Sequence, residues 1–461
     1  MSRLVMASNR VADPSKGSQS GGLAVALGDA LREFGGLWFG WDGTINDDAA
    51  SDRIAIDDSG AYKTATVSLN TEQYSGYYAG MSNNVLWPIL HYRLDLARLD
   101  ASYMGAYRQV NARFATALRR LIEPSDIVWV HDYHLIPLGA ELRAHEARNA
   151  IGFFLHIPFP PPDMLSALPN ADYFIRCLFS YDVIGFQTSS DLGNFQRYII
   201  ESGEGEIGEN GRVTAFGRTI TAKAYPIGID VDAFREMAFS PEAARIIDQL
   251  QRKTTETVHV IGVDRLDYTK GLPERFIAFE KLLTAYPENR KRLTLMQIAP
   301  PTREDIDAYS DIREQLEQLS GAINGRYADF DWTPIRYIHR SIQRATLAAL
   351  FRGSRIGLVT PLRDGMNLVA KEYIAAQDDD DPGVLILSQF AGAAEDLQDA
   401  LLVNPYDTAE VAEALEMAAT MSLDDRRVRQ QALLARVKEH DVKSWRYAFI
   451  NDLRSAQQHW N

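Results

Sequence analysis

The chain has 461 residues, and its 48 Lys and Arg against 62 Asp and Glu give a formal net charge of −14, which argues against a general nucleic-acid-binding protein. Hydrophobic residues make up 46% and charged residues 24%, an ordinary globular composition that excludes wholesale disorder. The single cysteine, Cys177, excludes a disulfide framework and any multi-cysteine metal cluster.

Short, nearly continuous apolar runs alternate with segments of helical period along the whole sequence. Runs of this kind are typical of strands that helices cover on both faces, as in parallel sheets. Strands are expected at residues 4–8, 127–131, 151–156, 183–187, 258–263, 293–298, 335–339, 356–360, 384–388 and 401–404. Helices are expected at residues 22–34, 273–285 and 342–352. This alternation predicts an α/β fold with doubly wound parallel sheets.

The chain is expected to hold two such domains. A turn with proline and glycine at residues 225–230 separates the two series of strands. We therefore predict domains at residues 1–228 and 229–441. Residues 442–460 carry apolar side chains at helical spacing, which predicts a C-terminal helix that docks back on the first domain.

The N-terminus leads directly into a strand-like run, without the apolar core and cleavage pattern of a signal peptide. No apolar stretch reaches the roughly 18 residues that span a bilayer. We expect a cytoplasmic protein that has neither a membrane nor a nucleic acid as its partner.

Several local patterns imitate ligand sites. Residues 203–208 satisfy the dinucleotide pattern G-x-G-x-x-G, but they open no helix and their glutamates would repel a pyrophosphate, which favours an exposed loop before a hairpin. The four aspartates at 378–381 are most simply a solvated loop. His131 and His134 end a strand, where polar groups lining a ligand cleft are favoured over a metal site that lacks a third ligand. Neither a metal nor a cofactor is predicted.

A glycine-rich segment at residues 17–24 follows the first strand and opens an apolar helix. Glycine lets backbone N–H groups approach a phosphate closely, and a helix N-terminus adds a favourable partial charge. Gly22 is therefore a candidate phosphate contact, with a plain flexible turn as the alternative.

In the second block, a charged loop follows the strand expected at 258–263. Its Arg265 and Lys270 could take the charge of a diphosphate, the guanidinium through forked hydrogen bonds and the ammonium as a point charge. The alternative is an ordinary surface pair answered by Asp264 and Asp267.

A second charged loop follows the strand expected at 356–360. Asp364 lies in its turn, and Asn367 and Leu368 open a helix that carries Glu372 about two turns later. The N–H groups of the first helical turn would face the same place as the previous loop, because carboxyl ends of parallel strands share one edge. A helix cap with a surface acid is the alternative, but the two loops together favour an anionic, nucleotide-like ligand.

The larger motifs resemble those of the trehalose-6-phosphate synthases, a family of retaining glycosyltransferases of GT-B architecture. The resemblance extends over nearly the whole chain and rests on long, unusual strings: Ser-Asn-Arg at 8–10, Gly-Gly-Leu at 21–23, Gly-Leu-Trp-Phe-Gly-Trp at 36–41, Leu-Trp-Pro at 86–88, His-Tyr-Arg at 91–93, Trp-Val-His-Asp-Tyr-His at 129–134 and His-Ile-Pro-Phe-Pro at 156–160. It implies two Rossmann-like domains facing across a cleft, the first binding the acceptor and the second the nucleotide sugar. The implied reaction moves glucose from UDP-glucose to glucose 6-phosphate and gives α,α-trehalose 6-phosphate and UDP.

Carried over residue by residue, the resemblance assigns each substrate its own side chains. The donor contacts would be Gly22, Arg265, Lys270, Asn367, Leu368 and Glu372. The acceptor contacts would be Arg10, Tyr78, Trp87, Asp132 and Arg303, with the two arginines on the 6-phosphate. The catalytic set would be Arg265, Lys270, Asp364 and His156, of which Asp364 and His156 would hydrogen-bond the transferred glucose. Residues 338–344, near the donor base, match less distinctively, so UDP is less clearly preferred over ADP and GDP.

The implied mechanism is a front-face displacement without a metal or an enzymic nucleophile, because cationic side chains and helix N–H groups stabilise the leaving UDP. Double displacement through Asp364 is the alternative. The competing functions are a sister enzyme with another phosphorylated acceptor, such as a glucosylglycerol-phosphate synthase, and a catalytically inactive sensor. We also expect a homo-oligomer and a separate trehalose-phosphate phosphatase acting on the product. Alanine in place of Arg265 and Lys270 should abolish turnover while barely changing the fold.

Overall fold

The computed structural model describes residues 2–11, 22–48, 53–252, 257–303, 307–458 and 460. The chain divides into two compact units. Unit 1 comprises Met1–Pro226 and Trp445–Asn461, and unit 2 comprises Ile227–Ser444. The substrate roles that the family resemblance implies for the two parts stay a prediction.

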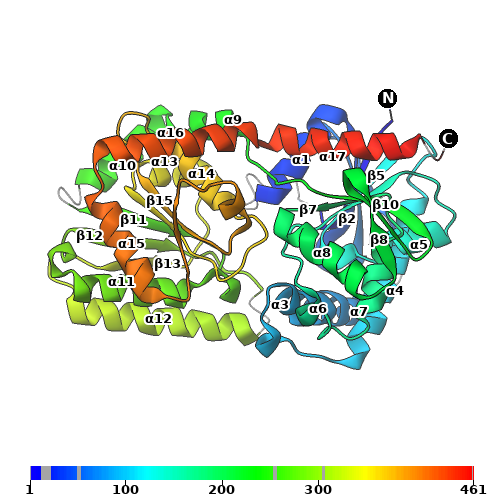
Figure 1. The fold of residues 1–461 in the computed structure, drawn as a ribbon, viewed down its shortest axis with the longest axis horizontal. Coiled ribbons are helices and arrows are strands. Elements are labelled where there is room, and N and C mark those ends of the chain that lie inside the picture. Colours follow the sequence, from blue (N-terminus) through cyan, green and yellow to red (C-terminus); the bar gives the residue numbers. More distant parts are fainter. Residues whose placement is uncertain are drawn as a thin grey trace. The chain divides into compact units, whose positions relative to one another are not determined.

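Within the described residues, unit 1 is built on a ten-stranded sheet with the order β3-β4-β2-β1-β5-β6-β7-β10-β9-β8 (Figure 1). The strands from β4 to β10 in that order are parallel, whereas β3 and the β8–β9 hairpin pair antiparallel at the edges. The strands are β1 (Leu4–Arg10), β2 (Gly36–Ile45), β3 (Ala55–Asp57), β4 (Lys63–Leu69), β5 (Ile127–His131), β6 (Ile151–Phe154), β7 (Val183–Phe186), β8 (Gly205–Ile207), β9 (Arg212–Ala215) and β10 (Arg218–Ala224).

The helices of unit 1 connect these strands. They are α1 (Gly22–Phe34), α2 (Thr71–Gln73), α3 (Trp87–Leu90), α4 (Ala101–Arg119), α5 (Leu138–Ala144), α6 (Pro162–Leu165), α7 (Ala171–Leu178), α8 (Ser189–Glu201) and most of α17 (Val442–Gln457), with short 3₁₀ turns η2 (Leu94–Leu96), η3 (Tyr133–Leu135) and η4 (Glu209–Gly211). Local sequence fixes several starts, since the Asp100 carboxylate caps Ser102 N at 2.8 Å and the Thr188 hydroxyl caps Asp191 N at 3.0 Å.

One helical segment of unit 1 has unusual geometry. Residues Tyr74–Leu86 form a π-helix, η1, between α2 and α3. Its last hydrogen bond runs from Trp87 N to Ser82 O, and the Asn83 side-chain amide donates to Tyr78 O at 2.8 Å. π-Helical geometry is rare and occurs often at functional sites. This segment carries Tyr78 and leads directly into Trp87, both candidate acceptor contacts.

Within the described residues, unit 2 is built on a six-stranded parallel sheet with the order β13-β12-β11-β14-β15-β16. The strands are β11 (Val258–Val263), β12 (Leu293–Ile298), β13 (Ile335–Ile338), β14 (Ile356–Val359), β15 (Val384–Ser388) and β16 (Leu401–Val403). Counted along the chain, this is the order 3-2-1-4-5-6 of a Rossmann sheet, whose strand order reverses between β11 and β14.

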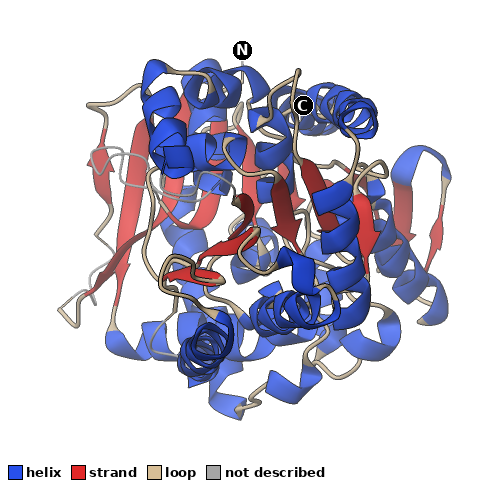
Figure 2. Ribbon diagram, turned by 90° about the vertical axis from the view of Figure 1, so that its left-hand side faces the viewer, coloured by secondary structure: helices blue, strands red, loops and turns tan. Residues whose placement is uncertain are grey.

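Helices cover both faces of the unit 2 sheet (Figure 2), with α11 and α12 on one face and α9, α10 and α13 on the other (Figure 1). The helices are α9 (Val231–Ala238), α10 (Pro241–Arg252), α11 (Leu272–Ala285), α12 (Asp307–Tyr327), α13 (Arg344–Arg352), α14 (Leu368–Ala376), α15 (Thr408–Thr420) and α16 (Leu423–Glu439), with 3₁₀ turns η5 (Tyr268–Lys270), η6 (Pro287–Asn289) and η7 (Gly392–Glu395). The doubly wound α/β fold expected from the sequence is confirmed.

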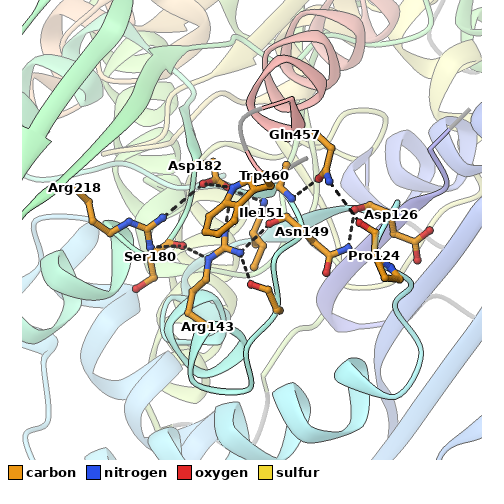
Figure 3. Close-up of polar contacts among 12 residues, drawn as sticks. Pro124, Asp126, Arg143, Asn149, Ile151, Ser180, Asp182, Arg218, Gln457 and Trp460 are labelled. Atoms are coloured by element: carbon orange, nitrogen blue, oxygen red, sulfur yellow. Dashed lines mark hydrogen bonds and ion pairs between the residues drawn. The ribbon is translucent and has the colours of Figure 1, made fainter.

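The end of the chain is fastened to the amino edge of the unit 1 sheet. Gln457 Oε1 accepts from Ala150 N at 2.5 Å, just before β6. The Trp460 ring lies 4.3 Å from the Arg143 guanidinium carbon, and its Nε1 donates to Asp182, just before β7 (Figure 3). The C-terminal helix is thus present, but it ends three residues before the predicted limit of 460.

Each of the ten strands expected from the sequence is present, with ends within two residues of the prediction. Sequence reasoning missed β2, β3, β4 and the β8–β10 meander, although it expected a hairpin after residue 208. The prediction of a solvated loop at 378–381 was incomplete: this exposed run is ion-paired with Arg235, Arg352, Arg355 and Arg426. In the described part of the chain, no helix is both long and apolar enough to cross a membrane.

Candidate functional site

The candidate residues fall into two clusters, which we describe separately because they belong to different units. The unit 1 cluster consists of Arg10, Tyr78, Trp87, Asp132 and His156, and the unit 2 cluster consists of Arg265, Lys270, Arg303, Asp364, Asn367, Leu368 and Glu372. Arg10 and Arg303, which the family resemblance assigns to one phosphate, therefore lie in different units. Gly22 is the first residue of α1, and the glycines at 17–21 lie outside the described residues.

The unit 2 cluster lies where the strand order of its sheet reverses. The loop after β11 carries Arg265 and Lys270, and the loop after β14 carries Asp364. The two loops are joined by a backbone hydrogen bond from Leu362 N to Thr269 O at 2.8 Å. Ligands of open α/β sheets bind at this position, where two loops diverge from neighbouring strands.

Lys270 and Asp364 form an ion pair across the two loops. Lys270 Nζ lies 2.5 Å from Asp364 Oδ2, and both side chains are largely buried. Asn367 Nδ2 donates to the same carboxylate oxygen at 3.0 Å, while Asn367 Oδ1 accepts from Ala370 N and caps α14. Asn367 itself has a left-handed backbone, with φ of 78°. The carboxylate of Asp364 is thus held by a cation and an amide, and it points to the first turn of α14.

That first turn is an anion-binding feature in its own right. The N–H groups of Leu368 and Val369 belong to the turn that has no intrahelical acceptors. Lys270 pairs with Asp364, whose carboxylate lies at the start of the same helix. A negative group bound there would therefore meet both the Lys270 ammonium and the helix N-terminus.

Arg303 and Arg265 lie around a second buried carboxylate, Asp267. Arg303 Nη1 lies 3.7 Å from Asp267 Oδ2 and 2.5 Å from the Tyr309 hydroxyl oxygen, and the Tyr309 hydroxyl donates to Asp267 at 3.2 Å. Burial works to raise the pKa of Asp267, but Arg303, Arg265 and Lys270 outweigh it, so that the pKa is lowered. Arg265 is exposed, whereas the Arg303 side chain is only 7% exposed.

Glu372 lies farther along α14 and pairs with Arg344 of α13, at 3.3 Å between Oε1 and Nη2. Burial raises the pKa of Glu372, and Arg344 partly opposes this shift. The preceding residue, Lys371, is fully buried, and its Nζ donates to Ile227 O at 2.9 Å. Burial lowers the pKa of Lys371 to about 8, although Asp396 counteracts it.

The unit 1 cluster also lies where strand order reverses, between β1 and β5. Arg10 ends β1 with an exposed side chain, and its guanidinium carbon lies 5.8 Å from the Trp41 ring centroid. A β-carbon at Gly43 would lie 2.4 Å from the Arg10 guanidinium, and Gly43 has φ of 84°. The Asp-Gly-Thr stretch at 42–44 thus provides space for Arg10.

Asp132 follows β5 in a strained backbone conformation, with φ of 76°. Its Oδ1 accepts from His156 N at 3.2 Å, which links the ends of β5 and β6. His156 Nε2 lies 3.1 Å from His131 Nδ1, and His156 Nδ1 lies 3.3 Å from the Gln187 amide nitrogen. Burial lowers the pKa of His156 to about 3 and that of His131 well below its usual value, so both rings are neutral at physiological pH.

The two aromatic candidates differ in exposure. Tyr78 is half-buried and stacks on His134, with ring centroids 6.0 Å apart and an interplanar angle of 11°. Trp87 is only 4% exposed and packs against His91 and Tyr133. Tyr78 therefore offers more ring surface to a sugar than Trp87 does.

Sequence reasoning placed the candidate residues on these two loops but did not identify the side chains that pair with them. The alternative interpretation paired Arg265 and Lys270 with Asp264 and Asp267. Lys270 instead forms its ion pair with Asp364, and Asp264 pairs with the buried Arg275 at 2.8 Å. Arg265, however, does act on Asp267, whose pKa it helps to lower. Arg275 was missed altogether. The signal for it was an arginine on the apolar stripe of α11, between Leu272 and Phe279.

Among the described residues, no group of three or more His, Cys, Asp and Glu side chains is arranged to hold a metal ion. The unit 2 cluster offers cations and helix N–H groups to an anion, and the unit 1 cluster offers an arginine, an aspartate and aromatic rings. The groups of unit 2 suit a diphosphate, and those of unit 1 suit a phosphorylated sugar.

Comparisons with known proteins agree with this chemistry. Residues 5–455 match the profile of glycosyltransferase family 20. A trehalose-6-phosphate synthase from Klebsiella pneumoniae subsp. pneumoniae is 47% identical over 456 residues, which cover 98% of this chain and 95% of the relative.

Two solved structures are similar over nearly their whole length. A UDP-forming α,α-trehalose-phosphate synthase from Burkholderia xenovorans in complex with glucose-6-phosphate superposes with a TM-score of 0.94 at 47% identity, covering 98% of this chain and 100% of that chain. An Escherichia coli protein bound with UDP-2-fluoro glucose superposes with a TM-score of 0.94 at 45% identity, covering 98% of this chain and 99% of that chain.

Proposed function

The chain belongs to glycosyltransferase family 20, and from that premise we propose that it transfers glucose from UDP-glucose to glucose 6-phosphate, giving α,α-trehalose 6-phosphate and UDP. The observation that carries the proposal is the meeting of Lys270, Asp364 and the first turn of α14 at the reversal of strand order in unit 2. The glucose-6-phosphate and UDP-2-fluoro glucose bound to the two similar proteins support the acceptor and the donor.

In this proposal, the donor diphosphate binds to Arg265, Lys270 and the N–H groups at Asn367 and Leu368. Lys270 already pairs with Asp364, so bound diphosphate would share the ammonium with that carboxylate. Gly22 would add a backbone contact and Glu372 would hold the ribose. Positive charge fixed where the leaving UDP develops negative charge lowers the barrier without reorganisation.

The acceptor would bind to Arg10, Tyr78, Trp87 and Asp132 of unit 1, and Arg303 would supply the second guanidinium for the 6-phosphate. A phosphate monoester and a guanidinium form paired, charge-assisted hydrogen bonds, and a sugar ring packs well on an aromatic face. Asp364 and His156 would hydrogen-bond the glucose that is transferred.

For the chemical step we propose front-face displacement with retention. The acceptor hydroxyl attacks the face that UDP leaves, and a β-phosphate oxygen takes its proton, so that neither a metal nor an enzymic nucleophile is needed. Trapping a glucosyl group covalently on Asp364 would overturn this step in favour of double displacement. Complete loss of turnover on chelation would overturn the assignment of charge stabilisation to Arg265 and Lys270.

The direct test is a matrix of donors and acceptors with purified protein. UDP-, ADP- and GDP-glucose are each combined with glucose 6-phosphate and with glycerol 3-phosphate, and the products are identified by mass and by anomeric configuration. We expect UDP release and α,α-trehalose 6-phosphate from the first pair. Turnover with glycerol 3-phosphate alone would identify a sister enzyme, and no turnover with any pair would identify an inactive sensor.

Three further proposals accompany this function. A separate phosphatase would remove the 6-phosphate of the product, the protein would act in the cytoplasm, and it would form a homo-oligomer. Sedimentation velocity tests the last point, since a species of one chain mass at all concentrations would contradict it.

A further inference from the structure

The guanidinium of Arg275 is buried beneath the loops of the unit 2 cluster. Arg275 lies in the first turn of α11, and its side chain is 0% exposed. Its Nη1 donates to Asp264 Oδ2 and to Gln297 Oε1, both at 2.8 Å, and its Nε donates to the Thr360 hydroxyl at 3.1 Å. A longer contact of 3.5 Å joins Nη2 to Lys270 O. A buried cation is stable only when paired and hydrogen-bonded in this way.

These partners come from three neighbouring strands at the centre of the sheet. Asp264 directly follows β11, Gln297 lies near the end of β12, and Thr360 directly follows β14. The guanidinium therefore spans the reversal of strand order between β11 and β14. Gly262 provides the space, since a β-carbon there would lie 2.5 Å from both Arg275 Nη1 and Gln297 Oε1.

Apart from Gln297, each partner lies in one of the two charged loops that carry candidate site residues. Asp264 precedes Arg265, the Lys270 carbonyl belongs to the candidate lysine itself, and Thr360 begins the loop that leads to Asp364. Gly271 brings the loops close together, since a β-carbon there would lie 2.5 Å from Thr360 O. Arg275 is thus the group that fixes the base of both charged loops at once.

We propose that Arg275 is a positioning residue for the donor diphosphate, holding the Lys270 loop and the Asp364 loop in one fixed arrangement; this inference rests on the proposed function. Arg275 touches none of the candidate donor side chains, so it would act through the loops. The planar guanidinium serves three acceptors in different directions, whereas a lysine ammonium is a compact charge that cannot reach all three from one place.

The first test compares Arg275→Lys with wild type in kinetics on both substrates. We expect kcat/KM for UDP-glucose to fall about 100-fold, as for an ångström-scale misplacement of binding groups. The KM for glucose 6-phosphate should change less than twofold. Arg426→Lys is the matched control, because Arg426 is also a largely buried arginine paired with an aspartate, Asp381, but at the amino edge of the same sheet. Its kinetics should match wild type.

The second test removes one acceptor without leaving an unpaired charge. Thr360→Val keeps the shape of the side chain and deletes the hydroxyl that accepts from Arg275 Nε. We expect it to lower kcat/KM for UDP-glucose at least about tenfold, as expected for the loss of one hydrogen bond donated by a charged group. Its effect should vanish in the Arg275→Lys background, because the two changes interrupt the same link. This variant carries the test if Arg275→Lys fails to fold.

The outcomes separate the inference from the function on which it rests. Wild-type protein that is inactive with UDP-glucose and glucose 6-phosphate contradicts the proposed function. Active wild-type protein overturns the inference if Arg275→Lys keeps its kcat/KM for UDP-glucose, or if kcat/KM falls equally for both substrates in step with the folded fraction. Additive effects of Arg275→Lys and Thr360→Val would also overturn it.

Discussion

His156 Nε2 lies 3.1 Å from His131 Nδ1, so that one of these two neutral rings donates to the other. The Gln187 amide nitrogen, a donor, lies 3.3 Å from His156 Nδ1, so His156 carries its proton on Nε2 and donates it to His131. In this state, both nitrogens of His156 have partners within unit 1. A sugar hydroxyl would have to compete with His131 for the Nε2 proton.

The buried histidine pair should make unit 1 sensitive to acid. Burial lowers the pKa of both rings, so between pH 6.5 and 5 the unfolded histidines take up protons while the folded ones do not. The free energy of unfolding therefore decreases as the pH is lowered from 6.5 to 5, by about 2 kcal/mol for each histidine. In His131→Phe, urea unfolding measured at pH 7 and pH 5 should show a loss about 2 kcal/mol smaller than in wild type. Equal losses would contradict the neutral state of His131.

Lys371 should have a pH signature of the same sign, but on the alkaline side. Its pKa is lowered to about 8 in the folded state, whereas an unfolded lysine titrates near 10.5. Between these values the unfolded chain binds more protons, so this group stabilises the fold as pH rises, by about 2 kcal/mol from pH 7.5 to 9.5. The free energy of unfolding, measured with urea at pH 7.5 and at pH 9.5, should therefore lack this gain in Lys371→Met. Lys438→Met, at an exposed lysine of α16, is the matched control and should retain it.

Much of the fold was predictable because buried parallel strands are short, continuous apolar runs. The strands that were missed lack this signature. In β2, three glycines and an aspartate interrupt the apolar residues, and β4 alternates threonine and small residues. The π-helix η1 could not be anticipated, since its i→i+5 hydrogen bonds leave no trace in a search for the period of 3.6 residues.

The candidate site was predictable at the level of loops but not of contacts. Carboxyl ends of parallel strands meet at one edge, so Lys270 and Asp364 could be placed near each other from the sequence. Their pairing, across 94 positions, depends on loop conformations that tertiary packing sets. The sequence also gave no reason to treat Lys270 differently from Arg265, although one side chain is buried and the other is exposed.

That difference changes the expected result of alanine substitution. Both Arg265→Ala and Lys270→Ala should lower kcat/KM for UDP-glucose at least about 100-fold, because each removes charge stabilisation at the donor. Lys270→Ala should also lower the free energy of unfolding by about 2 kcal/mol, because it leaves the largely buried Asp364 without its cation. Arg265→Ala, at an exposed side chain, should change it by less than about 0.5 kcal/mol. Urea unfolding curves of both variants separate the two effects.

The control for this comparison is Lys281→Ala, which removes an exposed lysine of α11. It should change neither the kinetics nor the stability. Equal stability losses in Arg265→Ala and Lys270→Ala would contradict the ion pair between Lys270 and Asp364.

The docking of α17 on the unit 1 sheet predicts a compensating pair of substitutions. Phe449 is fully buried, stacks on Trp129 with centroids 4.5 Å apart, and lies over Gly152 of β6. A β-carbon at Gly152 would lie 2.6 Å from the Phe449 ring, so Gly152→Ala should lower the free energy of unfolding by about 1–3 kcal/mol through overpacking. Phe449→Ala should lower it by about 3–5 kcal/mol, because it leaves a cavity.

Together, these substitutions should cost at least about 1 kcal/mol less than the sum of their separate effects, because the new methyl group enters the space that the ring leaves. Urea unfolding of the two single variants and the double variant measures this difference. The control is Gly193→Ala in α8, where a β-carbon would meet no atom within 4 Å. It should raise the free energy of unfolding by up to about 1 kcal/mol. In combination with Phe449→Ala, the two changes in the free energy of unfolding should simply add. Additivity in the Gly152 pair as well would mean that Phe449 does not fill the space above Gly152, and that α17 docks on unit 1 through other side chains.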